Sequence, residues 1–284
     1  MTTTNSISVV VPTRDRPRQL AACLEALTRQ HRTPAEILVV DDCSRDGRHV
    51  ESIVAAVEGA TVVRGSGHGP AAARNRGVRA ATGGIVCLTD DDCVPAEQWT
   101  ARLAARIDAG ADIAAGATLP SPPDAIATVA SQVITNELLA SSLDSSGTTI
   151  RFAPTCNLAM TAPIAERFRF DESFPLAAGE DREWCDRVTA AGHTIAYDRA
   201  ATVAHRPELT ARTFWRQQVR YGRGAAHWRQ RHTGDSDWQP ARFYLDLVRA
   251  GFGAGVGAGI LVLGAQVATA YGLVAESLVS ATRR

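Results

Sequence analysis

Apolar and polar positions alternate in blocks over the first 117 residues of the chain. Short β-branched or aliphatic runs occupy residues 7–11, 37–40, 61–63, 85–88 and 113–117. Between these runs apolar residues recur every three or four positions, as Leu20, Leu24 and Leu27 do, which is the spacing of one helix face. Short buried strands that alternate with helices predict a doubly wound, mostly parallel α/β sheet with flanking helices.

Polar groups follow four of these apolar runs directly. They are Pro12-Thr13-Arg14, Asp41-Asp42, Arg64-Gly65 and Asp90-Asp91-Asp92. The carboxyl ends of parallel strands meet at one sheet edge, where open α/β sheets bind ligands, so we expect a site there. Three adjacent carboxylates repel one another, which favours a compensating divalent cation, Mg²⁺ or Mn²⁺, shared with substrate phosphates. A solvated acidic turn is the alternative for such a run.

The pattern after residue 117 is less regular, and the prolines within residues 120–123 mark a boundary. We expect helices over residues 126–139 and 180–191, the second ended by Gly192. Thr210 is the predicted N-cap of a further helix over residues 210–233. One face of that helix carries Arg212, Arg216, Arg220 and Arg223.

Residues 250–275 contain no charged side chain. The stretch is long enough to cross a bilayer, but its alanines and glycines make it weakly hydrophobic. A membrane span, a helix lying on a membrane and a helical pair packed on the rest of the protein are therefore all open. We expect residues 210–284 to form a C-terminal helical extension.

The composition excludes several kinds of chemistry. All 30 basic residues are arginine, so no Schiff-base lysine or P-loop lysine can exist here. The 30 acidic residues balance this charge, which gives no argument for a nucleic-acid partner. Six cysteines without a C-x-x-C pair indicate reduced thiols, and the short polar N-terminus does not resemble a signal peptide. We expect a cytoplasmic protein, with a place at the inner face of the cell membrane left open.

Five motifs occur in order along the chain: VVVPTRDRP at 9–17, VVDDCSRDG at 39–47, GPAAARNRG at 69–77, TDDD at 89–92 and GED at 179–181. Together they resemble the family 2 glycosyltransferases of the GT-A (Rossmann-like) fold, over roughly residues 6–225. The resemblance implies inverting transfer of a sugar from a nucleotide-diphosphate donor, UDP-linked, to an acceptor hydroxyl. The implied acceptor is a glycan, a lipid-linked molecule or a small molecule.

The resemblance also divides the chain by role. Residues 1–117 would bind the nucleotide sugar, residues 118–209 would bind the acceptor and supply the base, and residues 210–284 would associate with a membrane. The implied donor-binding residues are Pro12, Thr13, Arg14, Asp42, Arg74, Asn75, Asp90 and Asp91. For Asp42, whose carboxylate would accept from uracil N–H, a helix cap is the alternative; for Arg74 and Asn75 it is an exposed helix face.

The expected metal ligands are Asp92, Asp90 and His205. Alternation along an extended segment would place Asp90 and Asp92 on the same side, with Asp92 as the better ligand by analogy. His205 follows a strand-like piece and resembles the histidine that completes the metal site in many relatives. A structural histidine is the alternative.

Asp181 is the candidate general base, which would take the proton of the acceptor hydroxyl, and Glu180 is the second choice. Both acids could instead favour the N-terminus of the helix that begins there. Asn157 and Trp184 are candidate acceptor contacts, with a core position as the alternative for Trp184. Arg220 lies in QQVRY, which resembles a Q-x-x-R-W element and suggests contact with the diphosphate. A basic amphipathic helix on an anionic membrane explains the same pattern.

Two other functions fit parts of the sequence. The spacing Asp90-x-Asp92-x-Val94 matches the D-x-D-x-[TV] pattern of haloacid-dehalogenase-like phosphatases, although here it follows the fourth strand and no lysine is available. A non-catalytic, membrane-tethered protein that binds sugar nucleotides is the third interpretation.

Overall fold

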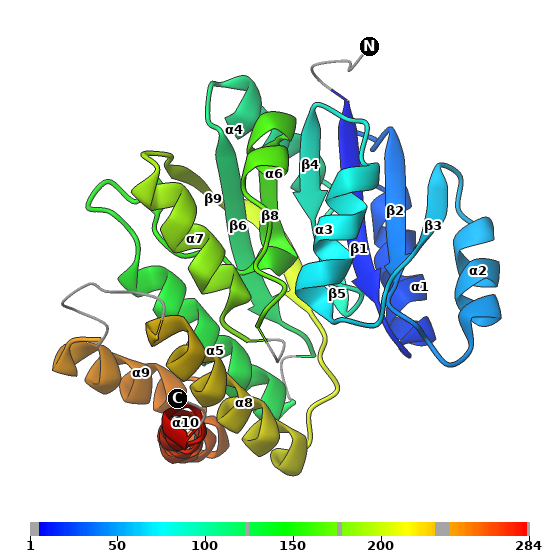
Figure 1. Ribbon diagram of the computed structural model, residues 1–284. Helices are drawn as coiled ribbons and strands as arrows, with labels where there is room; N and C mark the ends of the chain where they lie inside the picture. The colour runs from blue at the N-terminus through cyan, green and yellow to red at the C-terminus, as the bar shows by residue number, and fades with distance from the viewer. Residues whose placement is uncertain (1–5, 123–124, 175–177, 231–238, 283–284) are drawn as a thin grey trace.

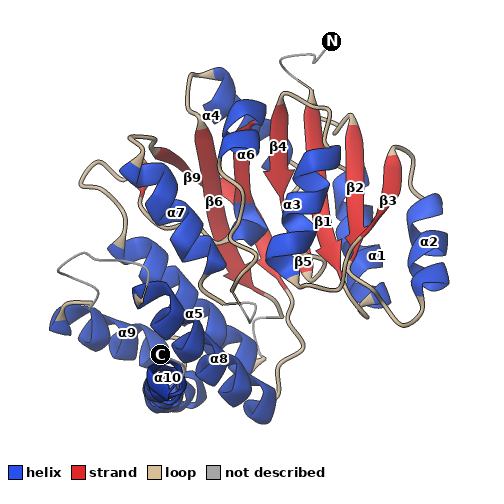
Figure 2. Cartoon of the chain, viewed as in Figure 1, coloured by secondary structure: helices blue, strands red, loops and turns tan. Residues whose placement is uncertain are grey.

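The computed structural model of the chain describes residues 6–122, 125–174, 178–230 and 239–282. One twisted sheet runs through the molecule, with helices against both of its faces (Figure 1). Further helices lie together beside the edge at which the N-terminal strands end (Figure 2). The α/β class with flanking helices and a C-terminal helical extension is confirmed.

The sheet consists of nine strands within the described residues. They are β1 (Ile7–Thr13), β2 (Glu36–Asp41), β3 (Ala60–Arg64), β4 (Ile85–Leu88), β5 (Cys93–Pro95), β6 (Ile113–Pro120), β7 (Thr149–Ile150), β8 (Leu158–Thr161) and β9 (Ile195–His205). Their order across the sheet is β3-β2-β1-β4-β8-β6-β9-β5, and β7 pairs with β9.

The N-terminal part of the sheet follows the sequence pattern. Strands β3, β2, β1 and β4 are parallel neighbours. Val9, Val10 and Val11 are fully buried, because helices cover both faces of a parallel sheet and such strands are apolar throughout. In the register Thr13 lies opposite Asp41, and Asp41 lies opposite Arg64. The polar strand ends therefore meet at one edge, as predicted.

The rest of the sheet is mixed. Strand β8 is inserted between β4 and β6 and runs antiparallel to both. Strand β6 pairs in parallel with β9, which returns antiparallel to β5. Because β6 crosses the boundary expected at residue 117, the first two predicted parts of the chain share one sheet. The division into three parts by role remains a prediction.

The helices of the described chain are α1 (Pro17–Thr28), α2 (Gly47–Ala55), α3 (Pro70–Ala80), α4 (Trp99–Asp108), α5 (Ile126–Ser141), α6 (Ala162–Arg167), α7 (Glu180–Ala190), α8 (Ala211–Arg229), α9 (Ala241–Gly253) and α10 (Val256–Thr282), with a 3₁₀ turn at Thr155–Asn157. Helices α3, α6 and α7 pack on one sheet face. Helices α1, α2 and α4 pack on the other face, so each face has its own apolar core.

Local signals locate several helix ends correctly. The hydroxyl of Thr210 accepts from the backbone N–H of Thr213 in a capping box at the start of α8. Gly192 follows α7 with φ of 90°, a left-handed conformation that glycine adopts at no steric cost. Helix α8 ends at Arg229, and residues 231–233 of the predicted helix, like Pro123 of the predicted boundary, lie outside the described residues.

The helices α5, α8, α9 and α10 form a third apolar core, centred on Phe214, Phe243 and Val262. Helices α8 and α10 approach so closely that a Cβ at Gly222 would lie 2.0 Å from the carbonyl oxygen of Thr269. The uncharged stretch is broken at Gly255, whose φ is 128°, so it forms the end of α9 and most of α10. Within the described residues, Val256–Val279 is long and apolar enough to cross a membrane by length and composition.

Candidate active site

A cavity of about 2090 Å³ lies between the carboxyl ends of the N-terminal strands and the helices α5, α7, α8 and α10. Cofactor and ligand sites usually measure about 300–1,000 Å³, so this space can hold a nucleotide together with a second molecule. Most of the predicted site residues line it: Pro12, Thr13, Arg14, Asp42, Arg74, Asp90, Asp91, Asp92, Glu180, Asp181, His205 and Arg220. Asn75, Asn157 and Trp184 do not.

The three consecutive acids form a turn, and the predicted alternation along an extended segment is wrong. The backbone N–H of Cys93 donates to the carbonyl of Asp90, which closes the turn before β5 pairs with β9. The carboxylate of Asp91 points toward β1, where it accepts from the hydroxyl of Thr13 at 2.7 Å. The turn therefore directs the three carboxylates in different directions, so Asp90 and Asp92 have different partners.

Arg16 binds two of the three acids. Its Nη1 lies 3.0 Å from Oδ1 of Asp91 and 2.9 Å from Oδ2 of Asp92. Burial raises the pKa of Asp91 to about 6, although the charge of Arg16 opposes this shift. The negative charge of Asp91 and Asp92 therefore binds the guanidinium of Arg16, and the same charge favours the binding of a metal cation. Arg16 stands within the first motif, but nothing in its local pattern distinguishes it from Arg14 as the partner of these acids.

Asp92 and His205 meet as predicted. Nε2 of His205 lies 3.5 Å from Oδ1 of Asp92. Burial alone would lower the pKa of His205, but the hydrogen bond and charge of Asp92 outweigh it and raise that pKa to about 9. Nδ1 of the ring lies 3.1 Å from Oε1 of Gln132 on α5. Gln132 is a further residue that the sequence pattern did not reveal.

These side chains suit a divalent cation. The carboxylate of Asp92 and the imidazole of His205 face each other, and oxygen and nitrogen donors of this kind bind Mg²⁺ or Mn²⁺ together with water and phosphate oxygens. Gln132 holds the second ring nitrogen, as the neighbours of metal-bound histidines do. Asp90 is paired with Arg74, whereas Asp92 faces His205, so Asp92 is the better placed of the two acids.

Asp42 closes a glycine-rich loop over the end of β2. Its two carboxylate oxygens accept from the backbone N–H groups of Gly67 and Gly69, at 2.7 and 2.9 Å. Gly65 passes so close that a Cβ there would lie 2.7 Å from Cα of Asp42. The neighbouring helix is capped by Asp46, so the helix-cap alternative for Asp42 is wrong.

Arg74 connects the donor side of the cavity to the start of α7. Its guanidinium donates to Oδ1 of Asp90 at 2.8 Å and to Oε1 of Glu180 at 3.2 Å. The side chain of Arg74 is only 6% exposed, so the exposed-face alternative for it is wrong. A buried arginine between two acids from different elements fixes their relative positions.

Asp181 lies in the first turn of α7 and lines the cavity. Burial, followed by the charge of Glu180, raises the pKa of Asp181 to about 7. Arg74 acts in the opposite direction and limits this shift. A carboxyl group with a pKa near neutrality can take a proton and release it again at physiological pH, which suits a general base.

Three predicted binding residues belong to the core instead. The side-chain amide of Asn75 bonds the backbone of Phe170 in both directions. Asn157 is fully buried and bonds the carbonyls of Ala117 and Ala201 and the indole of Trp99. Trp184 is fully buried, donates to the carbonyl of Phe168 and stacks on Phe170. Their polar groups are satisfied internally, so the structure gives these three side chains partners in the core rather than a place in the cavity.

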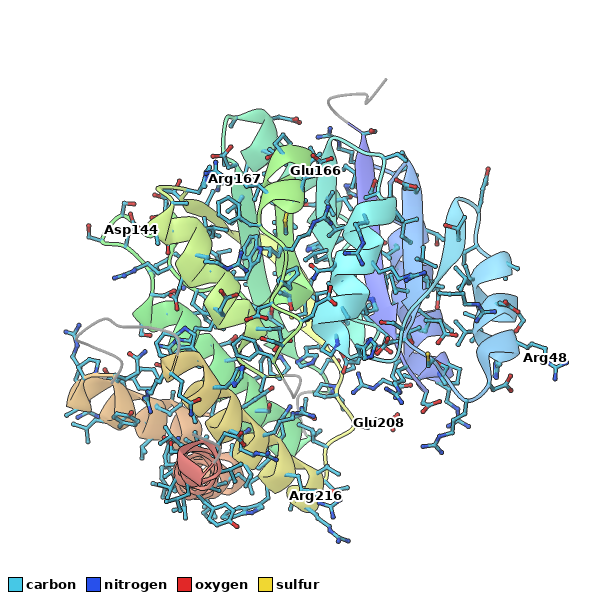
Figure 3. All side chains as sticks on the ribbon, in the orientation of Figure 1. Arg48, Asp144, Glu166, Arg167, Glu208 and Arg216 are labelled. Carbon is cyan, nitrogen blue, oxygen red and sulfur yellow. The ribbon has the colours of Figure 1, made fainter. Side chains whose placement is uncertain are left out.

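The arginines of α8 have different surroundings. Arg220 lines the cavity, and its Nε is buried without a hydrogen-bond partner among the described residues. Arg223 bonds Glu276 of α10 at 2.7 Å, so it holds two helices together. Arg216 also lines the cavity, but it is exposed and projects from the N-terminal end of α8 (Figure 3). Of the basic face predicted for this helix, Arg220 is therefore the side chain best placed for an anionic ligand.

Arg74→Met should destabilise the protein strongly, by about 3–5 kcal/mol, because it leaves the buried Glu180 without its cation. Arg29→Met is the matched control, since Arg29 pairs with Glu25 and both side chains are exposed. Its loss should cost about 1 kcal/mol or less. Urea unfolding of both variants measures the difference, and equal costs would contradict the role assigned to Arg74.

Known proteins resemble this chain in sequence. Residues 8–146 match the family described as Glycosyl transferase family 2. Glycosyltransferase AglE of Haloferax volcanii is 28% identical over 229 residues, which cover 77% of this chain and 72% of that protein. A pre-mycofactocin glycosyltransferase of Mycobacterium tuberculosis is 28% identical over 242 residues, but the match covers only 48% of that protein.

Solved structures resemble the fold. The mannosyltransferase PcManGT from Pyrobaculum calidifontis, in complex with GDP-Man and Mn²⁺, superposes with a TM-score of 0.63 at 19% identity, covering 92% of this chain and 73% of that one. Residues 1–349 of S. aureus TarS, in complex with UDP, superpose with a TM-score of 0.56 at 16% identity, covering 98% of this chain and 92% of that one. At these identities the likeness concerns the fold.

Proposed function

Since the chain belongs to family 2 of the glycosyltransferases and is an enzyme of glycosyl transfer, we propose that it uses a UDP-linked sugar and a divalent cation, Mg²⁺ or Mn²⁺. In this proposal the sugar passes to an acceptor hydroxyl with inversion at the anomeric carbon. Asp92 and His205 hold the cation, and Asp181 is the general base.

One observation carries the proposal. The pair Asp92–His205, which suits a cation, and Asp181, a carboxyl with a pKa near 7, line the same cavity from different elements. An inverting transfer needs these two functions together, because the leaving diphosphate must be neutralised while a base takes the acceptor proton. A pure binding protein has no use for a base tuned in this way.

The donor would be held at the strand ends. A bound cation supplies neutralisation of the negative charge that develops on the leaving diphosphate. Arg220 can contribute further positive charge from the opposite wall of the cavity. Asp42 is fixed by the N–H groups of Gly67 and Gly69, and the remaining lone pairs of its carboxylate can accept from the N–H of uracil.

The base would act from α7. Arg74 orients Glu180, and the charge of Glu180 in turn keeps the pKa of Asp181 high. Asp181 can then accept the hydroxyl proton of an acceptor that enters from the helical side of the cavity. The acceptor itself, a glycan, a lipid-linked molecule or a small molecule, is not distinguished by these contacts.

The donor class has a direct test. The neighbours bind different nucleotides, GDP-Man in one case and UDP in the other, and we propose UDP for this chain. Melting temperatures measured with UDP-, GDP- and dTDP-sugars, with Mn²⁺ or with EDTA, report binding to the native state. The UDP-sugars should stabilise the protein most and only with Mn²⁺. Equal stabilisation by all three nucleotides would contradict the proposal that the donor carries uracil.

The two other functions considered from the sequence do not hold. The family match and the named relatives are glycosyltransferases, so the phosphatase interpretation is wrong, and so is that of a non-catalytic binding protein. The acids that matched the phosphatase pattern are divided between Arg16 and Arg74.

We further propose that α10 rests on a membrane surface, which in the cell would be the inner face of the cell membrane. Its outer side carries an apolar stripe, defined as Val256, Ile260, Leu263, Val267, Tyr271, Val274 and Leu278, all exposed. The opposite side packs on α8 and α5, so α10 cannot be surrounded by lipid while the fold is intact. A helix with one buried and one apolar exposed side suits the interface rather than a span.

Ile260→Glu and Val267→Glu together should reduce binding to anionic liposomes several-fold, because two charges would enter the lipid-facing side of the apolar stripe. Leu119→Glu is the control, an exposed apolar position on β6, outside the helical extension. Co-sedimentation measures the bound fraction. If the double variant sediments as the wild type does, α10 does not contact lipid.

A further inference from the structure

A thiol lies directly beside the proposed cation site. Cys93 begins β5, and the antiparallel register places it opposite His205 of β9. Residues that face each other in this way project from the same side of a sheet. Sγ of Cys93 lies 3.9 Å from Oδ1 of Asp92, and Nε2 of His205 lies 3.5 Å from the same oxygen.

The three donor atoms, one oxygen, one nitrogen and one sulfur, all lie within 4.8 Å of one another. Tetrahedral zinc binds nitrogen at about 2.0–2.1 Å and sulfur at about 2.3 Å, which puts neighbouring ligand atoms roughly 3.3–3.8 Å apart. The two separations from Asp92 are already close to these values. Small side-chain rotations would therefore place these three atoms at three of the four ligand positions of a tetrahedral zinc ion.

The histidine is oriented for this role. Nε2 of Gln132 donates to Asn136, so the Oε1 of Gln132 is the atom that faces Nδ1 of His205. The ring must donate through Nδ1, which leaves Nε2 as the nitrogen directed at Asp92. A neighbour that fixes the ring through its other nitrogen is the usual arrangement around a metal-bound histidine.

We propose that Asp92, Cys93 and His205 form a site for a thiophilic divalent cation such as Zn²⁺, which excludes the cation of the transfer reaction. Thiolate and imidazole ligands select zinc, whereas Mg²⁺ and Mn²⁺ prefer oxygen. As the sulfur–zinc bond forms, the thiol of Cys93 loses its proton to solvent, and any proton on Nε2 of His205 leaves with it. Because Asp92 and His205 would serve both cations, the proposal rests on the proposed function, and zinc should inhibit transfer.

Cobalt(II) alone, added to the full chain, is the probe, because a thiolate ligand gives it an intense charge-transfer absorption in the near ultraviolet. We expect this absorption in the wild type, its displacement by Zn²⁺, and its loss in both Cys93→Ser and Cys93→Ala. Cobalt affinity should fall at least about tenfold in these variants. Two variants are used so that the test still stands if one of them fails to fold. The melting temperature shows whether each variant is folded.

Two matched controls should keep the absorption. Cys87→Ala removes an equally buried thiol from β4, and Cys43→Ser removes the exposed thiol. The proposal would be overturned if the wild type showed no charge-transfer absorption, or if the absorption survived in both Cys93 variants. It would also be overturned if only Cys156→Ser lost the absorption, because the ligand would then be the neighbouring thiol of Cys156. UDP binding by the wild type that needs no Mn²⁺ would instead contradict the proposed function, whatever the cobalt spectrum shows.

Discussion

Asp181→Asn is expected to slow sugar transfer by about 10²–10⁴-fold, the usual contribution of a general base. The amide cannot take the acceptor proton, so the loss should appear in kcat far more than in KM. In the proposed function Asp42 and Asp92, and not Asp181, hold the donor and the cation, so UDP affinity should stay close to that of the wild type. Single-turnover rates and UDP titrations on the same samples separate these effects.

If Asp181 instead only stabilises the N-terminus of α7, a different result is expected. Asn serves helix ends nearly as well as Asp, so the change should then cost about 1 kcal/mol or less and leave turnover unchanged. Asp186→Asn is the matched control, a carboxylate on the same helix that also lines the cavity and bonds Trp228. Normal turnover in Asp181→Asn would remove it from the mechanism and favour Glu180.

Asp92→Asn is expected to abolish Mn²⁺-dependent binding of UDP while the fold stays intact. The amide keeps the shape of the side chain but lacks the negative charge that would hold a divalent cation. Isothermal titration of UDP with Mn²⁺ measures the loss. Asp198→Asn is the control, because Asp198 is a buried acid of β9 that pairs with Arg106 on α4, outside the cavity. Unchanged affinity in folded Asp92→Asn would contradict the assignment.

The sequence pattern predicts the parts of the fold that local physics determines. The strands β1, β2, β4 and β6 are apolar runs stopped by polar or turn-forming residues, and their helices have regular apolar faces. Strand β8, Leu-Ala-Met-Thr, contains no β-branched aliphatic residue, so its insertion between β4 and β6 depends on contacts distant in sequence. The sheet is mixed because β8 runs antiparallel to β4 and β6, and β9 runs antiparallel to β5 and β7.

The same limit applies to the site. Asp92, His205 and Asp181 were identified from motifs, and the fold brings them to one cavity. Asn75, Asn157 and Trp184 could not be excluded in advance, because the groups that satisfy them come from other elements. Arg16 and Gln132 were missed for the converse reason. Each is unremarkable in its own helix or turn, and only tertiary contacts with Asp92 and His205 give it a role.

The pH dependence of single-turnover transfer tests the central claim, that Asp181 is the base, most directly. A base acts only when deprotonated, and burial raises the pKa of Asp181 to about 7. The rate should therefore rise about tenfold per pH unit below this value and level off above it. In Asp181→Asn the slow residual rate should lack this rise. A wild-type rate that does not change between about pH 5 and 8, or a rise that persists in the variant, would contradict the account.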